Sequence, residues 1–165
     1  MRDRESAHIA IEAALTGHLM LSSLHTNSAP AAAARLIDMG IEPYLVASSL
    51  ECVIGQRLVR RLCRHCRRAV TVPSADVGLE GGDETTVYEP VGCVHCSATG
   101  YRGRAGIYEV MTVTDEIRAM IVARATAPDI MRTAVEQGMR PLREAGLAKV
   151  RAGETSIAEV ARVTG

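Results

Sequence analysis

The 165-residue sequence contains no phenylalanine and no tryptophan, and only four tyrosines, although 47% of its residues are hydrophobic. Its core must therefore be built from Ala, Val, Leu, Ile and Met, whose side chains each bury little area, and we expect a thin core. With 19 basic and 19 acidic residues, the formal net charge is zero. This balance gives no electrostatic reason to expect nucleic acid or an anionic membrane surface as a partner.

Long apolar runs are also absent. No run approaches the roughly 20 residues that a membrane-spanning helix needs, and no signal peptide precedes the first predicted helix. From these absences we expect a soluble, cytoplasmic chain with no direct membrane span. Its length leaves room for one domain or slightly more.

A phosphate-binding P-loop is missing too. The motif GxxxxGK[ST] needs a lysine that reaches the β- and γ-phosphates. The single lysine of the chain, Lys149, lies in "AGLAKV" without the required glycines. Neither a nucleophile elbow nor a metalloprotease motif replaces the P-loop. On its own residues, the chain does not look like a complete enzyme.

The N-terminal third alternates between predicted helices and strands. Asp3 is a suitable N-cap for a first helix. The apolar run "HLMLSSL" (18–24) is typical of a strand buried inside a parallel sheet. Helices are predicted at 29–39 and after Pro43, and "QRLVRRL" (56–62) is predicted to be a strand.

The rest of the chain contains one more predicted strand and is otherwise mostly helical. "GIYEVMTV" (106–113) is predicted to be a strand that leads into a helix capped by Thr114. Ser156 and Glu159 fit a capping box at the start of the last helix. The acid- and glycine-rich stretch "SADVGLEGGDE" (74–84) is expected to be a flexible surface loop.

Four of the five cysteines form two CxxC pairs, "CRHC" (63–66) and "CVHC" (93–96). In each pair a tight turn can direct both thiolates to one ion, and two pairs complete the tetrahedral shell that Zn²⁺ prefers. A site with four protein ligands leaves no open position for hydrolytic chemistry. We therefore predict a structural zinc ion held by Cys63, Cys66, Cys93 and Cys96.

Other interpretations of the cysteine pairs stay open. A redox-active pair or four free thiols also fit the composition, although a redox site rarely needs two matched pairs in one small domain. His65 and His95 lie inside the pairs and are candidate substitute ligands, ranked below the regularly spaced thiolates. The fifth cysteine, Cys52, stands apart.

A polar cluster, His25 to Asn27, follows the predicted strand at 18–24. Ligands of open parallel sheets bind just outside the carboxyl ends of the strands, so this cluster could contact phosphate or orient water. The simpler interpretation is that these side chains hydrogen-bond a turn and cap the next helix. Position alone favours the simpler interpretation.

Several motifs occur in a fixed order along nearly the whole chain: "TGHLMLSSLHTN", "IGQRLVRRLC", the two cysteine pairs and "YRGRAGIYE". Together they resemble the C-terminal half of the ATPases of type II secretion and type IV pilus assembly. The first motif resembles the histidine box of this family, and the four cysteines resemble its tetracysteine motif. The last motif resembles the strand that returns from the tetracysteine motif.

The resemblance implies an α/β fold in three parts: the C-terminal portion of a RecA-like P-loop ATPase core at 1–62, a tetracysteine zinc-binding module at 63–104, and a C-terminal strand with an all-α subdomain at 105–165. Complete family members are homo-hexamers that use ATP and Mg²⁺. They drive assembly of a pilus or pseudopilus through platform proteins of the inner membrane. The implied location is cytoplasmic and peripheral to the inner membrane through those partners.

The resemblance also implies roles for individual residues. His25 would be the catalytic histidine-box residue near the γ-phosphate of ATP. Other nucleotide-binding residues would be His18, Thr26, Gln56 and Arg57. The Walker A loop has no counterpart, and only Arg2 and Asp3 match the end of the Walker B segment, without its glutamate. We therefore expect that the chain alone neither binds ATP tightly nor hydrolyses it, and that Met1 marks the edge of a truncated gene or of a split protein.

Two other functions fit some of the same observations. A non-catalytic, zinc-stapled interaction module could act on a complete ATPase or on a platform protein. A zinc-ribbon protein that binds nucleic acid is disfavoured by the neutral charge and the near absence of aromatic residues.

Overall fold

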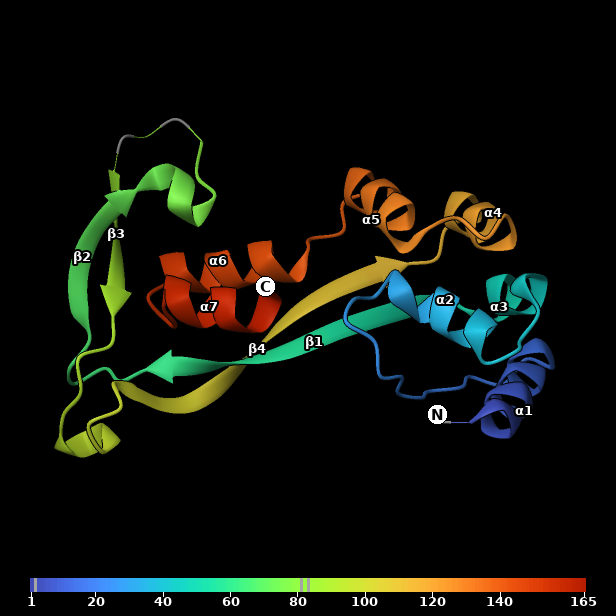
Figure 1. Cartoon of the computed structure of the whole chain (residues 1–165), viewed down its shortest axis with the longest axis horizontal. Helices are drawn as coiled ribbons and strands as arrows, with labels where there is room; N and C mark the ends of the chain where they lie inside the picture. The colour runs from blue at the N-terminus through green and yellow to red at the C-terminus, as the bar shows by residue number, and fades with distance from the viewer. Residues whose placement is uncertain (2, 81, 83) are drawn as a thin grey trace. The chain divides into compact units, whose positions relative to one another are not determined.

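The computed structural model describes residues 1, 3–80, 82 and 84–165. The helices and strands of these residues are shown in Figure 1. In chain order they are α1 (Arg4–Leu15), α2 (Ala31–Asp38), α3 (Pro43–Ser49), β1 (Cys52–Leu62), β2 (Arg68–Pro73), the 3₁₀ helix η1 (Ser74–Val77), β3 (Glu84–Glu89), the 3₁₀ helix η2 (Val94–Cys96), β4 (Tyr101–Thr112), α4 (Asp115–Val122), α5 (Ala127–Glu136), α6 (Leu142–Arg151) and α7 (Ile157–Thr164).

The mixed α/β chain divides into two compact units. Unit 1 comprises Met1–Gly55 with Glu109–Met139, and unit 2 comprises Gln56–Tyr108 with Arg140–Gly165. This division differs from the three consecutive segments expected at 1–62, 63–104 and 105–165. Each of the strands β1 and β4 has residues in both units. Of the C-terminal helices, α4 and α5 belong to unit 1, and α6 and α7 belong to unit 2.

Most helix boundaries follow the capping signals in the sequence. Asp3 accepts a hydrogen bond from the Ser6 N–H at 2.8 Å at the start of α1, as predicted. Thr114 caps α4 by accepting from the Ile117 N–H at 3.3 Å, which was also predicted. The predicted helices after Ala29 and Pro43 are α2 and α3. Both predicted strands at 56–62 and 106–113 are confirmed as parts of the longer β1 and β4.

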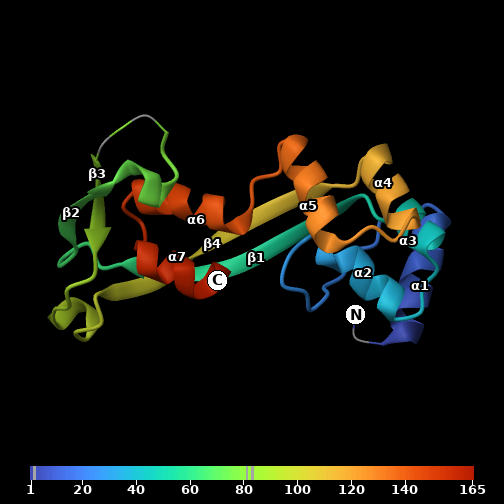
Figure 2. The same cartoon turned by 45° about the horizontal axis from the view of Figure 1, so that its top comes forward.

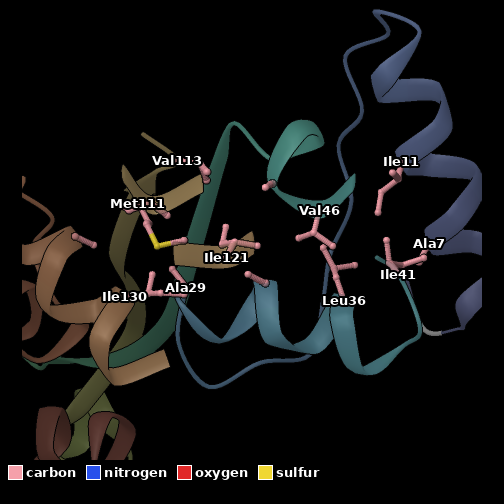
Figure 3. Close-up of a cluster of buried hydrophobic side chains, with 14 of the residues drawn as sticks. Ala7, Ile11, Ala29, Leu36, Ile41, Val46, Met111, Val113, Ile121 and Ile130 are labelled. Carbon is pink, nitrogen blue, oxygen red and sulfur yellow. The ribbon is translucent and has the colours of Figure 1, made fainter. Parts of the chain in front are cut away.

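Unit 1 has a core of small aliphatic side chains from five helices and β4. In Figure 3, Leu36 of α2 and Val46 of α3 point toward each other between the two helices. Ile117 and Ile121 are the buried side chains of α4, and both belong to this core. The core therefore uses the aliphatic residues that the composition predicts, with methionine at Met111 filling the space beside β4.

Strands β1 and β4 pair with each other and run in opposite directions (Figure 1). Along β4 the side chains alternate between buried and exposed, with Glu109 and Met111 buried and Tyr108 and Val110 exposed. This period of two is the expected pattern for a strand with one covered face.

Unit 2 contains the antiparallel hairpin β2–β3 and the helices α6 and α7. The two helices lie side by side in Figures 1 and 2. Its main core is a cluster of valines: Val77, Val87, Val150 and Val160. Gly146 allows α6 to approach α7 closely, because a Cβ at this position would lie 2.6 Å from a methyl carbon of Val160. Close packing of small side chains compensates for the absence of aromatic residues in this core.

The predicted surface loop at 74–84 is partly ordered. Residues Ser74–Val77 form η1, and Val77 is buried in the valine cluster. Arg151 of α6 donates a hydrogen bond to the Val77 carbonyl at 2.5 Å. Composition alone missed this anchor because a few apolar residues in a short stretch rich in glycine and acidic residues were not interpreted as a periodic signal. Residues 81 and 83 of this stretch lie outside the described residues, as does Arg2 of the predicted Walker B remnant.

The prediction of a buried strand at 18–24 is wrong. The segment has no regular secondary structure, and Leu19 and Leu21 are 86% and 87% exposed. A strand is buried inside a parallel sheet only when neighbouring strands pair with both of its edges. No strand of the described chain pairs with this segment. Its apolar pattern is therefore present without the neighbours that would bury it.

A buried ionic network fastens α7 to β1 within unit 2. The Glu159 carboxylate is fully buried and accepts hydrogen bonds from the backbone N–H of Arg60 at 2.9 Å and from its guanidinium at 2.7 Å. The guanidinium of Arg162 donates to the same carboxylate at 2.7 Å. Although burial opposes its ionisation, the hydrogen bonds from Arg162 and Arg60 lower the pKa of Glu159 to about 2.

Of the two hydrogen bonds that define the predicted capping box, the structure shows the one to the Ser156 side chain. Ser156 does cap α7, since its hydroxyl accepts from the Glu159 N–H at 3.2 Å. The Glu159 carboxylate, however, binds the two arginines. Arg60 also lies over the ring of Tyr101 at 4.1 Å, and the Tyr101 hydroxyl is 2.7 Å from the Ser156 hydroxyl. A pattern local to the helix could not reveal partners on β1 and β4.

The Glu159 network predicts a pH-dependent stability. Its carboxyl has a pKa of about 2 in the folded chain against an ordinary value of 4.5, so its stabilisation is present above pH 4.5 and is lost as the pH falls toward 2. We expect Glu159→Gln to lower the free energy of unfolding at neutral pH by about 3 kcal/mol, because two arginines lose their shared carboxylate. The variant should also lose less stability on acidification than the unaltered chain, as measured by urea unfolding across this pH range.

Glu144→Gln is the matched control, because Glu144 is an exposed acid on α6. It should leave the free energy of unfolding and its pH dependence unchanged. The same acid sensitivity in Glu159→Gln as in the unaltered chain would contradict the stabilising role of this carboxylate.

Candidate functional site

Two tight turns present the four paired cysteines in unit 2. Cys63 directly follows β1, and its carbonyl accepts hydrogen bonds from the N–H groups of Cys66 at 3.3 Å and Arg67 at 3.0 Å. In the second turn, the Cys93 carbonyl accepts from Cys96 at 3.2 Å and from Ala98 at 2.9 Å. Each turn brings two thiols to its inner side, as the CxxC spacing predicts.

The four sulfur atoms converge on one point. All lie within 4.8 Å of one another. The Sγ–Sγ distances are 3.9 Å between Cys63 and Cys93, and 3.8 Å both between Cys66 and Cys96 and between Cys93 and Cys96. A tetrahedral thiolate shell with metal–sulfur bonds of about 2.3 Å has edges of about 3.8 Å, whereas a disulfide needs about 2.05 Å. The group can therefore hold a metal ion, and its spacing does not correspond to disulfides.

Backbone N–H groups point at two of the sulfurs. The N–H groups of Cys93 and Gly100 each donate to Cys96 Sγ at 3.2 Å, and the Gly92 N–H donates to Cys66 Sγ at 3.3 Å. Burial works against ionisation of Cys96, yet the donors from Cys93 and Gly100 lower the pKa of this thiol to about 6. Burial raises the pKa of the Cys93 thiol to about 11. Metal binding must therefore displace protons from the group, which makes the affinity pH-dependent.

The two histidines inside the cysteine pairs stack on each other. The ring centroids of His65 and His95 are 4.2 Å apart. Among the described residues, the group that can hold an ion consists of the four cysteines without either histidine. The sequence placed these histidines in equivalent positions of the two pairs, but their stacking was not predicted.

The predicted nucleotide contacts of unit 1 lie between α1 and α2. His18 stays close to the end of α1, with its Nδ1 atom 3.2 Å from the Thr16 hydroxyl and 3.3 Å from the Ala13 carbonyl. The Thr26 hydroxyl donates to the Ser28 carbonyl at 3.1 Å. His25 is exposed, and within the described ranges it forms no hydrogen bond or ion pair. Its role at a phosphate stays a prediction.

The two predicted contacts on β1 belong to unit 2. The Gln56 amide nitrogen is 3.5 Å from the Tyr108 hydroxyl, and the Arg57 guanidinium donates to the Gln56 carbonyl at 3.3 Å. Their predicted proximity to a nucleotide likewise stays a prediction.

Sequence reasoning missed a buried carboxylate, Glu109, near the predicted histidine box. Its Oε1 atom accepts a hydrogen bond from the Ala29 N–H at 2.5 Å, just before α2 begins. Gly55 makes room for it, because a Cβ there would lie 2.7 Å from the same oxygen. The signal that could have found it is an acid on the buried face of an alternating strand, between Ile107 and Met111.

The sequence matches the family model described as "Type II/IV secretion system protein" over residues 1–162. The chain belongs to this family. It is 48% identical over 166 residues to type II secretion system protein E of Klebsiella pneumoniae, and 46% identical over 164 residues to the type II secretion system protein HxcR of Pseudomonas aeruginosa. It is 43% identical over 166 residues to the type IV pilus assembly ATPase PilB of Myxococcus xanthus.

These matches cover 97–99% of this chain but only 29–33% of each relative. The chain thus spans about a third of the length of these members of the type II/IV secretion family. The predicted resemblance to secretion and pilus ATPases is confirmed at this level.

Solved structures show the same fold. The ATPase DotB of Legionella pneumophila matches with a TM-score of 0.64 at 19% identity, covering 99% of this chain and 36% of that one. DotB of Yersinia pseudotuberculosis matches with a TM-score of 0.61 at 17% identity. None of the described helices is long and apolar enough to cross a bilayer.

Two glycines near the cysteines provide a matched pair for testing the metal centre. Gly100 and Gly103 both have a positive φ, of 76° and 79°. A Cβ on Gly100 would lie 2.4 Å from Pro90 Cβ, whereas a Cβ on Gly103 would meet nothing within 4 Å. We expect Gly100→Ala to weaken cobalt(II) binding by about tenfold or more, because the N–H···S donor to Cys96 must move. Titration of the thiolate–cobalt absorption band measures this.

Gly103→Ala carries the same left-handed strain of about 1 kcal/mol without the clash. It should bind cobalt(II) nearly as tightly as the unaltered chain. Equal losses in the two variants would contradict the role assigned to the Gly100 turn.

Proposed function

We propose that the chain is the C-terminal part of an ATPase that powers type II protein secretion or type IV pilus assembly, and that it does not hydrolyse ATP by itself. The observation that carries this proposal is the family match over residues 1–162. Relatives that share 43–48% of its residues bear the names of secretion proteins and pilus assembly ATPases. The chain has no P-loop lysine, and this is the physical reason for proposing that it does not hydrolyse ATP by itself.

Within this proposal, residues 1–62 form a portion of a RecA-like core, 63–104 form the zinc module and 105–165 form a strand with a helical subdomain. The family match includes all of residues 1–62, which supports the first assignment. His25 is the histidine near the γ-phosphate. The other nucleotide contacts are His18, Thr26, Gln56 and Arg57.

The ion of the cysteine group is Zn²⁺. Four thiolates at tetrahedral spacing suit this ion and leave no coordination site for water, so zinc is structural here. When bound, it supplies a cross-link between the turns at Cys63 and Cys93, which lie 30 residues apart in sequence. Zinc therefore stabilises unit 2, whose aliphatic core is small.

The partners that we propose are those of the complete ATPase. It is a homo-hexamer that binds ATP and Mg²⁺ and acts on platform proteins of the inner membrane. The proposed location is the cytoplasm, at the inner membrane through those partners, with no nucleic acid involved. The zero net charge of the chain supports the last point.

The zinc assignment predicts about one zinc ion per purified chain. Cys66→Ser should reduce the zinc content to near zero, because a hydroxyl replaces one of four soft ligands. Cys52→Ser is the matched control, since Cys52 is exposed and outside the group. Elemental analysis of the three proteins gives the stoichiometry, and a zinc-free unaltered chain would contradict the assignment.

The ATPase assignment can be tested in a chimera. In it, this chain replaces the matching part of type II secretion system protein E of Klebsiella pneumoniae, to which it is 48% identical. We expect the chimera to hydrolyse ATP and the isolated chain not to. His25→Ala should lower the kcat of the chimera by about a hundredfold or more, as loss of a catalytic proton-transfer group does.

His8→Ala is the control, because His8 is exposed on α1 and its ring lies 3.3 Å from the Glu12 carboxylate of the same helix. It should leave kcat unchanged. A chimera that folds and assembles but hydrolyses no ATP would contradict the proposal, and capture of this chain by a complete ATPase would then favour a non-catalytic interaction module.

A further inference from the structure

A cationic cavity lies beside the first cysteine turn, entirely within unit 2. Its volume is about 640 Å³, and its lining includes the charged side chains of Arg61, Arg64, Arg67, Arg102 and Glu154 together with His65. The chain as a whole is neutral. Four arginines against one carboxylate therefore represent a local concentration of positive charge that the overall composition does not suggest.

The single carboxylate of the cavity is already paired. Glu154 lies 3.4 Å from the ammonium of Lys149 and 4.0 Å from the guanidinium of Arg61. It therefore cannot also neutralise Arg64 or Arg102. Both of these arginines are exposed, and no carboxylate in the described part of the chain pairs with either. The cavity keeps an excess of positive charge for a ligand.

One guanidinium of the cavity is fixed by the fold. Arg67 donates to the Gly153 carbonyl at 2.6 Å, and its guanidinium lies over the ring of Tyr88 at 4.2 Å. Gly153 has a φ of 68° and admits this side chain, because a Cβ there would lie 2.9 Å from the Arg67 nitrogen. A positioned arginine loses less conformational entropy on binding an anion than a free one.

We propose that this cavity binds a phosphate-bearing anion. The planar fork of arginine matches the geometry of phosphate oxygens, and hydrogen bonds between such ionised groups are about twice as strong as neutral ones. The volume lies within the range of small-molecule sites. The lining offers little apolar surface beyond Leu62 and Ala152, so an apolar peptide anchor fits it poorly.

This site is separate from the nucleotide contacts proposed above. His18, His25 and Thr26 belong to unit 1, and neither Gln56 nor Arg57 lines the cavity. The inference therefore does not rest on ATP binding by the complete ATPase. The ligand phosphate belongs either to a soluble compound or to a lipid headgroup, which the same guanidinium groups recognise equally.

The test uses the zinc-loaded chain and inorganic phosphate as the first probe. We expect saturable shifts of the backbone amide resonances of residues 61–67 and 102 in two-dimensional NMR. Arg64→Ser with Arg102→Ser should weaken binding by about tenfold or more, because the anion loses charge-assisted hydrogen bonds to two guanidinium groups. Both side chains are exposed, so their replacement leaves the packing of unit 2 intact.

Arg140→Ser with Arg143→Ser is the matched control, because it removes two exposed arginines of unit 2 that lie outside the cavity. Its affinity should stay within about twofold of the unaltered chain, as expected for screened surface charges. Succinate, a dicarboxylate, should bind more weakly than phosphate. Equal weakening in both double variants, or equal binding of succinate, would overturn the proposal.

A second arm identifies the source of the phosphate. Co-sedimentation with vesicles of phosphatidylglycerol and phosphatidylcholine, competed by phosphate and lost in the Arg64/Arg102 variant, identifies a lipid headgroup. Phosphate binding without co-sedimentation identifies a soluble ligand. Absence of both phosphate-induced shifts and vesicle binding would overturn the site.

Discussion

The fold must be stable without phenylalanine and tryptophan, and its other features follow from this constraint. Aliphatic clusters of small residues bury limited area, so polar cross-links carry much of the long-range order. In unit 1 the buried Glu109 carboxylate holds the backbone before α2. In unit 2 Glu159 joins α7 to β1 through Arg60, and Arg162 of α7 is a second partner of the same carboxylate. Such buried charges are tolerated because each has hydrogen-bond partners.

The zinc ion proposed for the cysteine group is a third cross-link, between the turns at Cys63 and Cys93. In this proposal the ion fixes the turn at residues 63–66, and Cys63 of the same turn also lines the cationic cavity. The proposed zinc ion is structural in its chemistry, yet the turn that would hold it also presents a surface with an excess of arginine.

Features that depend on neighbouring residues along the chain were predicted well. The N-caps at Asp3, Thr114 and Ser156 are present, because a cap needs only a side chain and an N–H two or three residues away. The cysteine ligand group was predicted for a similar reason: the CxxC spacing defines a turn, and four thiols can satisfy one tetrahedral ion. By contrast, the predicted strand at 18–24 lacked its neighbours, and a strand has no stability apart from them.

The sequence by itself determined the helix boundaries, the aliphatic composition of the cores, the cysteine group and membership of the secretion family. Only the tertiary structure decided which distant residues meet. Glu159 was predicted as a local cap but binds Arg60, 99 positions away in sequence. The cavity arginines come from the end of β1, from the first cysteine turn and the residue after it, and from β4, and their convergence with residues 152–154 appears in no local pattern. The physical reason is that spacing along the chain controls local hydrogen bonds, whereas charge clustering depends on how strands and helices pack.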